Sequence, residues 1–304
     1  MASETQDTTT PGDTATETDG SSRFSVGEVP ALVGPSVLWF ALFLGAPLLL
    51  VGVYSFLTYS SFNVLWEFST AAWANVFTGT VIRALGLTLA IATASTALTL
   101  LFGYPLAYYL RFYTSQNGGI VLLLFLVIPF WTSALIRTLG WYPVLGRLGV
   151  VNKLLQGAGI VQEPVEWLLF SPFSTLVGLL GAYVVFMAAP IYISLSQIDE
   201  DLIDASETLR GDPWETFRNV TLPLSMPGVI IGIIFVFVLS MGDFIVPQFL
   251  SGGQGTITTL VYLSVNNGLN YPNAAALSIT LLAVIFAVVY GLTRIVDISD
   301  IARA

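Results

Sequence analysis

The chain has 304 residues, of which 55% are hydrophobic and only 10% are charged, and its mean hydropathy is +0.81. These values exclude an ordinary soluble domain and predict a polytopic membrane protein. The net charge of −9 argues against nucleic-acid binding, which needs a basic surface. The absence of cysteine and histidine excludes disulfides, the usual zinc sites and histidine-based catalysis.

The first 28 residues differ in composition from the rest of the chain. They are rich in Thr, Ser, Asp and Glu and nearly lack apolar residues, which predicts a disordered acidic tail. No basic segment leads into a short apolar core, so we do not expect a signal peptide. Lys153 is the single lysine of the chain, and an acidic excess with so little lysine indicates adaptation to high salt.

Long apolar stretches fill the remainder, residues 29–304, which we expect to form one transmembrane domain. A transmembrane helix needs about 20 apolar residues. Backbone groups in lipid must form their hydrogen bonds within the segment, so the fold class is predicted to be all-α. Turn signals divide the domain into about six spans, at residues 31–57, 84–110, 119–139, 174–197, 226–250 and 274–296.

The third of these spans carries both a proline and an arginine. Pro129 frees a backbone carbonyl and predicts a kink in the helix. Ser133, Arg137 and Trp141 are spaced by four residues, which places them on one helical face. In the loop that follows, Gly146–Leu155 has an amphipathic pattern, and we expect this loop to be external.

A polar segment, Gln197–Pro223, interrupts the apolar pattern and holds seven of the 19 acidic residues. Apolar residues recur at helical spacing in its first half, which predicts a helix with an acidic opposite face. Asp212 and Pro213 suit the start of a second helix, Glu215 can complete a capping box, and Pro223 is expected to end that helix. The alternative, an amphipathic helix on the bilayer surface, is usually basic.

Asp243 is the one acidic residue between Asn219 and Ile295. An ionised carboxylate within the hydrocarbon region is costly and is usually functional or paired. One hypothesis is that Asp243 lines a translocation path and binds a passing cationic amine. The alternative is an ion pair with Arg137 that only holds the bundle together.

Two tryptophans are further candidates for the substrate path. Trp131 and Trp141 could stack on an amine through cation–π attraction. Aromatic residues near the ends of spans also belong to the interfacial belt, which is the alternative role.

The polar segment resembles the EAA loop of ATP-binding-cassette (ABC) importer permeases, which fits into a cleft of the ATPase subunit. Asp204-Ala205-Ser206 match its Glu-Ala-Ala, and Val220, Leu222 and Pro223 match its Ile-x-Leu-Pro ending at the family spacing. Arg210 stands at the position of the bend glycine, and Gly211 follows, so the turn between the two helices is expected to be shifted. The resemblance implies coupling to the ATPase through Asp204, Ala205, Ser206, Glu207, Arg210, Gly211, Trp214, Leu222 and Pro223.

Four other stretches are similar to the PotB-type permeases of spermidine/putrescine importers, over roughly residues 30–300. They are Pro-Phe-Trp-Thr-Ser from Pro129, Leu-Gly-Arg from Leu145, Gly-Asp-Phe from Gly242 and Asn-Tyr-Pro from Asn270. The resemblance implies a MetI-like permease of a type I importer that moves a small organic cation inward by alternating access, without a cofactor. It also implies its partners: an ABC ATPase dimer, a second related permease, an extracellular substrate-binding protein and the lipid bilayer.

The sequence does not predict an enzyme. It has no Gly-x-x-x-x-Gly-Lys-Ser/Thr phosphate loop, since Lys153 follows Asn152, so a partner must hydrolyse any ATP. Two alternatives stay open. One is an importer permease for another solute, such as iron(III), thiamine, an opine or an aminophosphonate. The other is a stand-alone secondary transporter that uses Asp243 and Arg137 as its coupling site.

If the EAA-like loop is cytoplasmic, as the resemblance implies, six spans place both termini on the cytoplasmic side of the plasma membrane as well. The distribution of basic residues has the sign of the positive-inside rule. Those expected inside are Arg23, Arg111, Arg210, Arg218, Arg294 and Arg303, and those expected outside are Arg83, Arg147 and Lys153.

Overall fold

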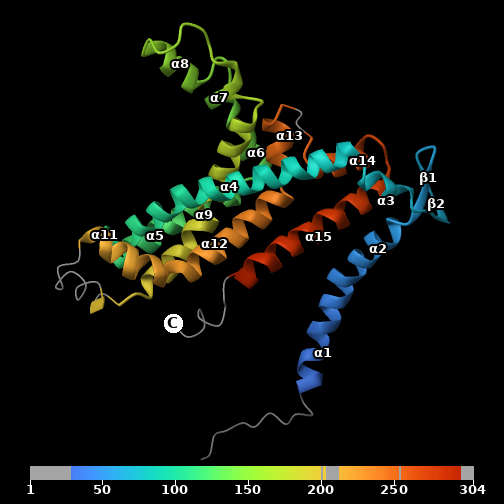
Figure 1. Cartoon of the computed structure of the whole chain (residues 1–304), viewed down its shortest axis with the longest axis horizontal. Helices are drawn as coiled ribbons and strands as arrows, with labels where there is room; N and C mark the ends of the chain where they lie inside the picture. Colours follow the sequence, from blue (N-terminus) through green and yellow to red (C-terminus); the bar gives the residue numbers. More distant parts are fainter. Residues whose placement is uncertain (1–28, 200, 203–211, 253–254, 296–304) are drawn as a thin grey trace, which may run out of the picture. The chain divides into compact units, whose positions relative to one another are not determined.

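The computed structural model describes residues 29–199, 201–202, 212–252 and 255–295 (Figure 1). The predicted acidic tail lies outside these ranges. So do six of the predicted coupling residues, namely Asp204, Ala205, Ser206, Glu207, Arg210 and Gly211. The chain divides into two units, residues 1–49 and residues 50–304.

The first unit is an apolar helix. Helix α1 (Val29–Phe40) runs through a π-helical turn, η1 (Ala41–Gly45), into α2 (Ala46–Tyr54), whose last residues belong to the second unit. Trp39 and Phe43 lie one turn apart and stack with their ring centroids 4.0 Å apart. The 21-residue stretch Gly34–Tyr54 is long and apolar enough to cross a membrane.

The second unit is a helical bundle with one small hairpin. After β1 (Leu57–Ser60) and β2 (Asn63–Phe68) come α3 (Ala71–Val76), α4 (Gly79–Phe112), α5 (Gln116–Val127), the 3₁₀ turn η2 (Ile128–Trp131), α6 (Ala134–Leu139), α7 (Tyr142–Leu145), α8 (Val150–Gly157) and the 3₁₀ turn η3 (Glu166–Leu168). Then follow α9 (Pro172–Ser196), α11 (Pro213–Thr216), the π-helical turn η4 (Phe217–Thr221), α12 (Leu222–Gly242), α13 (Ile245–Leu250), α14 (Ile257–Asn266) and α15 (Tyr271–Ile295).

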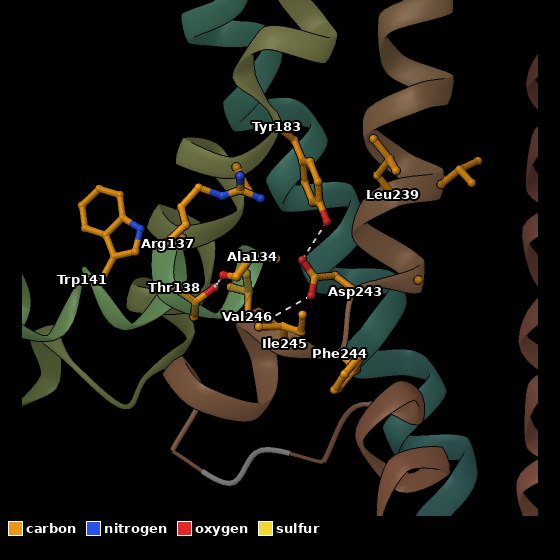
Figure 2. A pocket seen from close by; sticks show the side chains of 14 residues that line it. Ala134, Arg137, Thr138, Trp141, Tyr183, Leu239, Asp243, Phe244, Ile245 and Val246 are labelled. Carbon is orange, nitrogen blue, oxygen red and sulfur yellow. Dashed lines mark hydrogen bonds between the residues drawn. The ribbon is translucent and has the colours of Figure 1, made fainter. Parts of the chain in front are cut away.

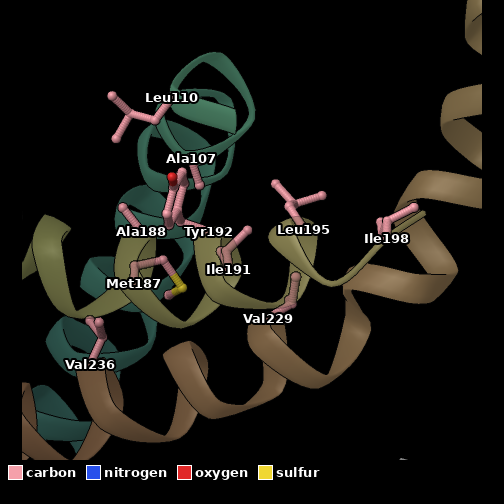
Figure 3. Packing of buried hydrophobic residues seen from close by; sticks show 10 residues of the cluster. All are labelled: Ala107, Leu110, Met187, Ala188, Ile191, Tyr192, Leu195, Ile198, Val229 and Val236. Atoms are coloured by element: carbon pink, nitrogen blue, oxygen red, sulfur yellow. The ribbon is translucent and has the colours of Figure 1, made fainter. Parts of the chain in front are cut away.

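The core of this bundle lies where α4, α9 and α12 pack together (Figure 3). Met187 of α9 is fully buried between two glycines of the neighbouring helices. A Cβ atom at Gly103 would lie 2.9 Å from Met187 Cγ, and one at Gly232 would lie 2.7 Å from Met187 Sδ. Small residues at these positions let the three helices approach closely, as in other membrane bundles.

The hairpin β1–β2 differs from the predicted first span, which extended to residue 57. The two strands are antiparallel, with Ser60 opposite Asn63. Ser61 and Phe62 form the turn with φ angles of 50° and 62°, the left-handed conformations that a tight two-residue hairpin requires. Apart from this hairpin, the described residues of the unit are helical or irregular, in agreement with the all-α prediction.

The prediction of a single helix at 119–139 was wrong. The helical stretches Asn117–Trp131 and Ala134–Gly157 meet at an angle of 99°. Pro129 cannot donate a backbone hydrogen bond, and Thr132 adopts an extended conformation with ψ of 154°, which ends the helix there. The break therefore follows the 3₁₀ turn that contains Pro129, and its angle exceeds the kink that the sequence predicts.

The prediction of a continuous helix at 226–250 was also wrong. Helix α12 ends at Gly242, Asp243 is extended with ψ of 126°, and α13 begins at Ile245. The described residues contain five helices long and apolar enough to cross a membrane, and the bent pair brings the number to six. This count agrees with the prediction of about six spans.

Two predictions about the end of the polar segment were wrong as well. The second helix begins at Pro213 as expected, but the side chain of Asp212 forms no capping hydrogen bond. Pro223 does not end this helix, which continues as one 30-residue stretch, Pro213–Gly242. The π-helical turn η4 ends at Thr221, so Pro223 lies in the first turn of the α-helical part, where a proline is tolerated.

Candidate functional site

Two broken helices meet at a cavity in the second unit. The first break separates η2 from α6, and the second separates α12 from α13, with α6 and α13 in contact. The cavity has a volume of about 330 Å³, and residues of α6, α9, α12 and α13 line it (Figure 2). Discontinuous helices commonly form the substrate sites of membrane transporters, because unwound backbone at that depth needs a polar environment.

Asp243 lies at the second break and faces this cavity. Its Oδ2 atom accepts a hydrogen bond of 2.7 Å from the hydroxyl of Tyr183 in α9. Its Oδ1 atom accepts one of 3.1 Å from the backbone N–H of Val246, in the first turn of α13. Its carbonyl accepts one of 2.9 Å from the hydroxyl of Thr258 in α14. These bonds fix the carboxylate at the wall of the cavity, where the residue is half-buried.

Arg137 lines the same cavity from α6 but is bonded elsewhere. Its Nη1 atom donates a hydrogen bond of 2.9 Å to the carbonyl of Pro129, across the first break. Its guanidinium also lies over the ring of Phe130, 4.6 Å from the centroid. Within the part of the chain that the structure describes, Arg137 forms no ion pair with Asp243. The carboxylate is held by Tyr183 instead. The structure therefore does not contain the Asp243–Arg137 ion pair that the alternative hypothesis requires.

The two candidate tryptophans lie in different surroundings. Trp141 lines the cavity, and its ring packs on α9, where a Cβ atom at Gly181 would lie 2.9 Å from Trp141 Cζ2. Trp131 does not line this cavity, and 84% of its surface is exposed. The geometry therefore brings Asp243, Arg137 and Trp141 together and leaves Trp131 apart from them.

The sequence did not single out Tyr183, the residue that holds the carboxylate. A tyrosine within an apolar span is itself a signal, because a buried phenolic hydroxyl usually needs a hydrogen-bond partner. Which residue provides that partner depends on helix packing between positions 60 residues apart, and periodicity does not report such a contact.

Chemically, this arrangement suits a cation that can donate hydrogen bonds. A carboxylate can accept up to about four hydrogen bonds, and two are already made here. An ammonium group has only donors to offer and can also lie against aromatic faces such as those of Tyr183 and Trp141.

The other predicted site is the end of the bundle next to the polar segment. Trp214 is 64% exposed and stacks on Phe217, with ring centroids 5.4 Å apart. Phe217 in turn meets Tyr104 and Tyr108 of α4 edge-on, at 5.8 Å and 6.0 Å. The Tyr104 hydroxyl forms a hydrogen bond of 2.9 Å with Ser225 of α12. This aromatic cluster joins an exposed tryptophan to two core helices.

Leu222 and Pro223, the remaining described coupling residues, form the first turn of α12. They lie within the long helix that leads from the aromatic cluster to the cavity, and so they do not form a separate loop.

The family model described as "Binding-protein-dependent transport system inner membrane component" matches residues 99–300. The spermidine/putrescine transport system permease protein PotB of Salmonella typhimurium is 30% identical over 265 residues, covering 86% of this chain and 89% of that protein. PotB of Escherichia coli K12 is also 30% identical, covering 80% of this chain and 88% of the relative.

Among solved structures, a chain of the bacterial alginate ABC transporter in complex with an alginate pentasaccharide-bound periplasmic protein has a TM-score of 0.66. The match covers 88% of this chain and 92% of that one at 18% identity, so it concerns the fold. The family match extends over both broken helices, the polar segment and the cavity. The chain therefore belongs to the family of binding-protein-dependent transport system inner membrane components and is a multi-pass transport permease rather than an enzyme.

Proposed function

We propose that this chain is the permease subunit of an ATP-driven importer that moves spermidine and putrescine into the cell. The observation that carries the proposal is the Asp243 carboxylate, held by Tyr183 in a cavity between two broken helices. Polyamines are flexible cations whose ammonium groups match such a carboxylate. The names of the PotB relatives support the same substrate class.

Transport by alternating access requires that the cavity open to one side of the membrane at a time. Both breaks border the cavity, and transporters commonly bend at such breaks during alternating access. We therefore assign the movement that opens and closes the path to α6 and α13. Arg137, which bonds across the first break, positions α6 in this scheme.

The proposal includes the partners that the EAA-like segment implies. An ABC ATPase dimer binds the segment that precedes Trp214, a second related permease completes the path, and an extracellular substrate-binding protein delivers the cargo. The solved relative with a periplasmic protein supports this last partner. In this scheme both termini and the polar segment are cytoplasmic, and the loops between α6 and α9 are extracellular.

The test is uptake of labelled spermidine and putrescine by cells with the gene, without it, and with it restored. We expect uptake to depend on the gene and to be competed by unlabelled polyamines. Iron(III), thiamine and aminophosphonates should not compete. Unchanged polyamine uptake in the deleted strain would contradict the substrate assignment and leave the family membership intact.

A further inference from the structure

A second groove lies directly across the α12–α13 break from the Asp243 cavity. It has a volume of about 390 Å³ and is bordered by α12, α14 and α15. Gly242 and Phe244 line both this groove and the Asp243 cavity, so the two spaces adjoin at the break. Phe244 is labelled beside Asp243 in Figure 2.

The wall of this groove contains a stacked aromatic pair. The rings of Phe244 and Tyr262 lie 5.4 Å apart, with an angle of 17° between their planes, and both side chains are partly exposed. In a stacked pair each ring has one face covered by its partner and one face turned outward. An aromatic face attracts an ammonium group by about 0.5–1 kcal/mol at exposed sites and by about 2 kcal/mol when water is excluded.

Polar groups accompany the aromatic pair. Thr258, Asn266 and Ser278 line the groove, and none of its lining residues is basic. Thr258 also donates a hydrogen bond to the backbone carbonyl of Asp243, so the same side chain of α14 lines the groove and holds the backbone at Asp243. Hydroxyl and amide oxygens accept hydrogen bonds from an ammonium group. A lining that is aromatic and polar without positive charge suits a cation rather than an anion.

We propose that the Phe244–Tyr262 pair forms a second ammonium subsite, which binds one end of an elongated polyamine while Asp243 binds the other. This inference rests on the proposed function, because it concerns how the same cation is held. A linear polyamine carries ammonium groups separated by methylene chains, and two spaces that adjoin at Gly242 and Phe244 match that pattern. The Phe244–Tyr262 pair therefore selects cations that carry at least two amines.

The competing explanation is that the two rings only pack the break against α14. Packing depends on the apolar volume of Tyr262, whereas cation binding depends on its aromatic face. Tyr262→Phe keeps the face, and Tyr262→Leu removes it while keeping an apolar side chain. Phe286→Leu, at an exposed position of α15 outside the groove, is the matched control for loss of an aromatic ring.

The experiment measures uptake into vesicles that contain the full importer, at saturating spermidine-loaded binding protein, so that the affinity of the binding protein does not limit the rate. Uptake is divided by the amount of assembled importer. We expect about a tenfold loss for Tyr262→Leu, which corresponds to one cation–π contact. Tyr262→Phe and Phe286→Leu should stay within about twofold of the wild type.

Equal uptake by Tyr262→Leu and the wild type would overturn the subsite while leaving the proposed function in place. So would equal losses in Tyr262→Leu and Phe286→Leu, or a loss that assembly alone explains. Absence of polyamine uptake by the wild-type importer would be a different result, because it would overturn the proposed function and the subsite together.

Discussion

The two ends of helix α12 differ in how closely neighbouring atoms approach the backbone. Near its start, a Cβ atom at Gly228 would lie 2.3 Å from the Pro190 carbonyl oxygen, so α12 and α9 are in close backbone contact. At its other end the helix stops at Gly242, where a Cβ atom would meet nothing within 4 Å, and a cavity follows. The surroundings of Gly228 (the packed half of the helix) therefore differ from those of Gly242 (the open half), and the charged Asp243 directly follows Gly242.

This difference shows how a membrane helix can carry a carboxylate. The packed half relies on small residues and van der Waals contact, as membrane helices generally do. The open half relies on specific hydrogen bonds, from Tyr183 and the Val246 N–H, to keep the Asp243 side chain in place. Substitutions in the two halves should accordingly affect different measurements.

The largest expected effect is on transport, at the open end. Asp243→Asn keeps the size of the side chain but removes its charge, and hydrogen bonds to charged groups contribute about 1.5–3 kcal/mol. We expect polyamine uptake per assembled importer to fall by about ten- to a hundredfold. Assembly should change little, because the amide oxygen can accept from the Val246 N–H while the amide NH2 donates to the Tyr183 hydroxyl oxygen. Equal losses of uptake and of assembled importer would instead assign Asp243 a structural role.

The next effect is on stability, at the packed end. Gly228→Ala places a methyl group against backbone atoms, and overpacking of this kind costs about 1–3 kcal/mol. Gly86→Ala in α4 is the control, because a Cβ atom there meets nothing within 4 Å. Thermal unfolding in detergent should show a lower melting temperature for Gly228→Ala. For Gly86→Ala it should be unchanged or higher, since alanine favours a helix by up to about 1 kcal/mol over glycine. Equal melting temperatures would remove the distinction between the two halves.

The smallest effect is expected where the packed half meets the polar segment. Trp214→Ala removes the exposed ring that stacks on Phe217, and an aromatic pair contributes about 0.5–1.5 kcal/mol. We expect the number of polyamines imported per ATP hydrolysed to fall about two- to tenfold, with normal membrane insertion. Trp167→Ala is the control, since Trp167 is also exposed and lies edge-on to a phenylalanine, Phe173, at the start of α9. A normal ratio in Trp214→Ala would argue against a coupling role.

Much of the fold could be predicted from the apolar pattern, because a lipid environment imposes helices of a known minimum length. The number of spans and the start of a helix at Pro213 followed from such local rules. The hairpin at 57–68 was missed because apolar residues continue into β1, and composition does not report where an apolar run changes from helix to strand.

The candidate site could be predicted only in part. Asp243 was found from its charge in an apolar region, but the sequence left open whether it binds a passing cation or pairs with Arg137, and it did not predict the contact with Tyr183. The contact with Tyr183 depends on how α9 and α12 are rotated about their axes, which a single sequence does not give. The helix breaks were missed for a related reason, since Pro129 predicts a kink but not the extended Thr132 that follows it.

The close packing around Met187 also limits how the bundle can move. Its side chain fills the space left by Gly103 and Gly232, so α4, α9 and α12 interlock there. Gly228, one turn before Gly232, is in close contact with Pro190 of α9 as well. Because α12 meets α9 closely at two successive turns, it cannot slide or rotate against α9 without displacing Pro190 or Met187. We therefore expect a displacement of Trp214 to move α9 and α12 together as one body.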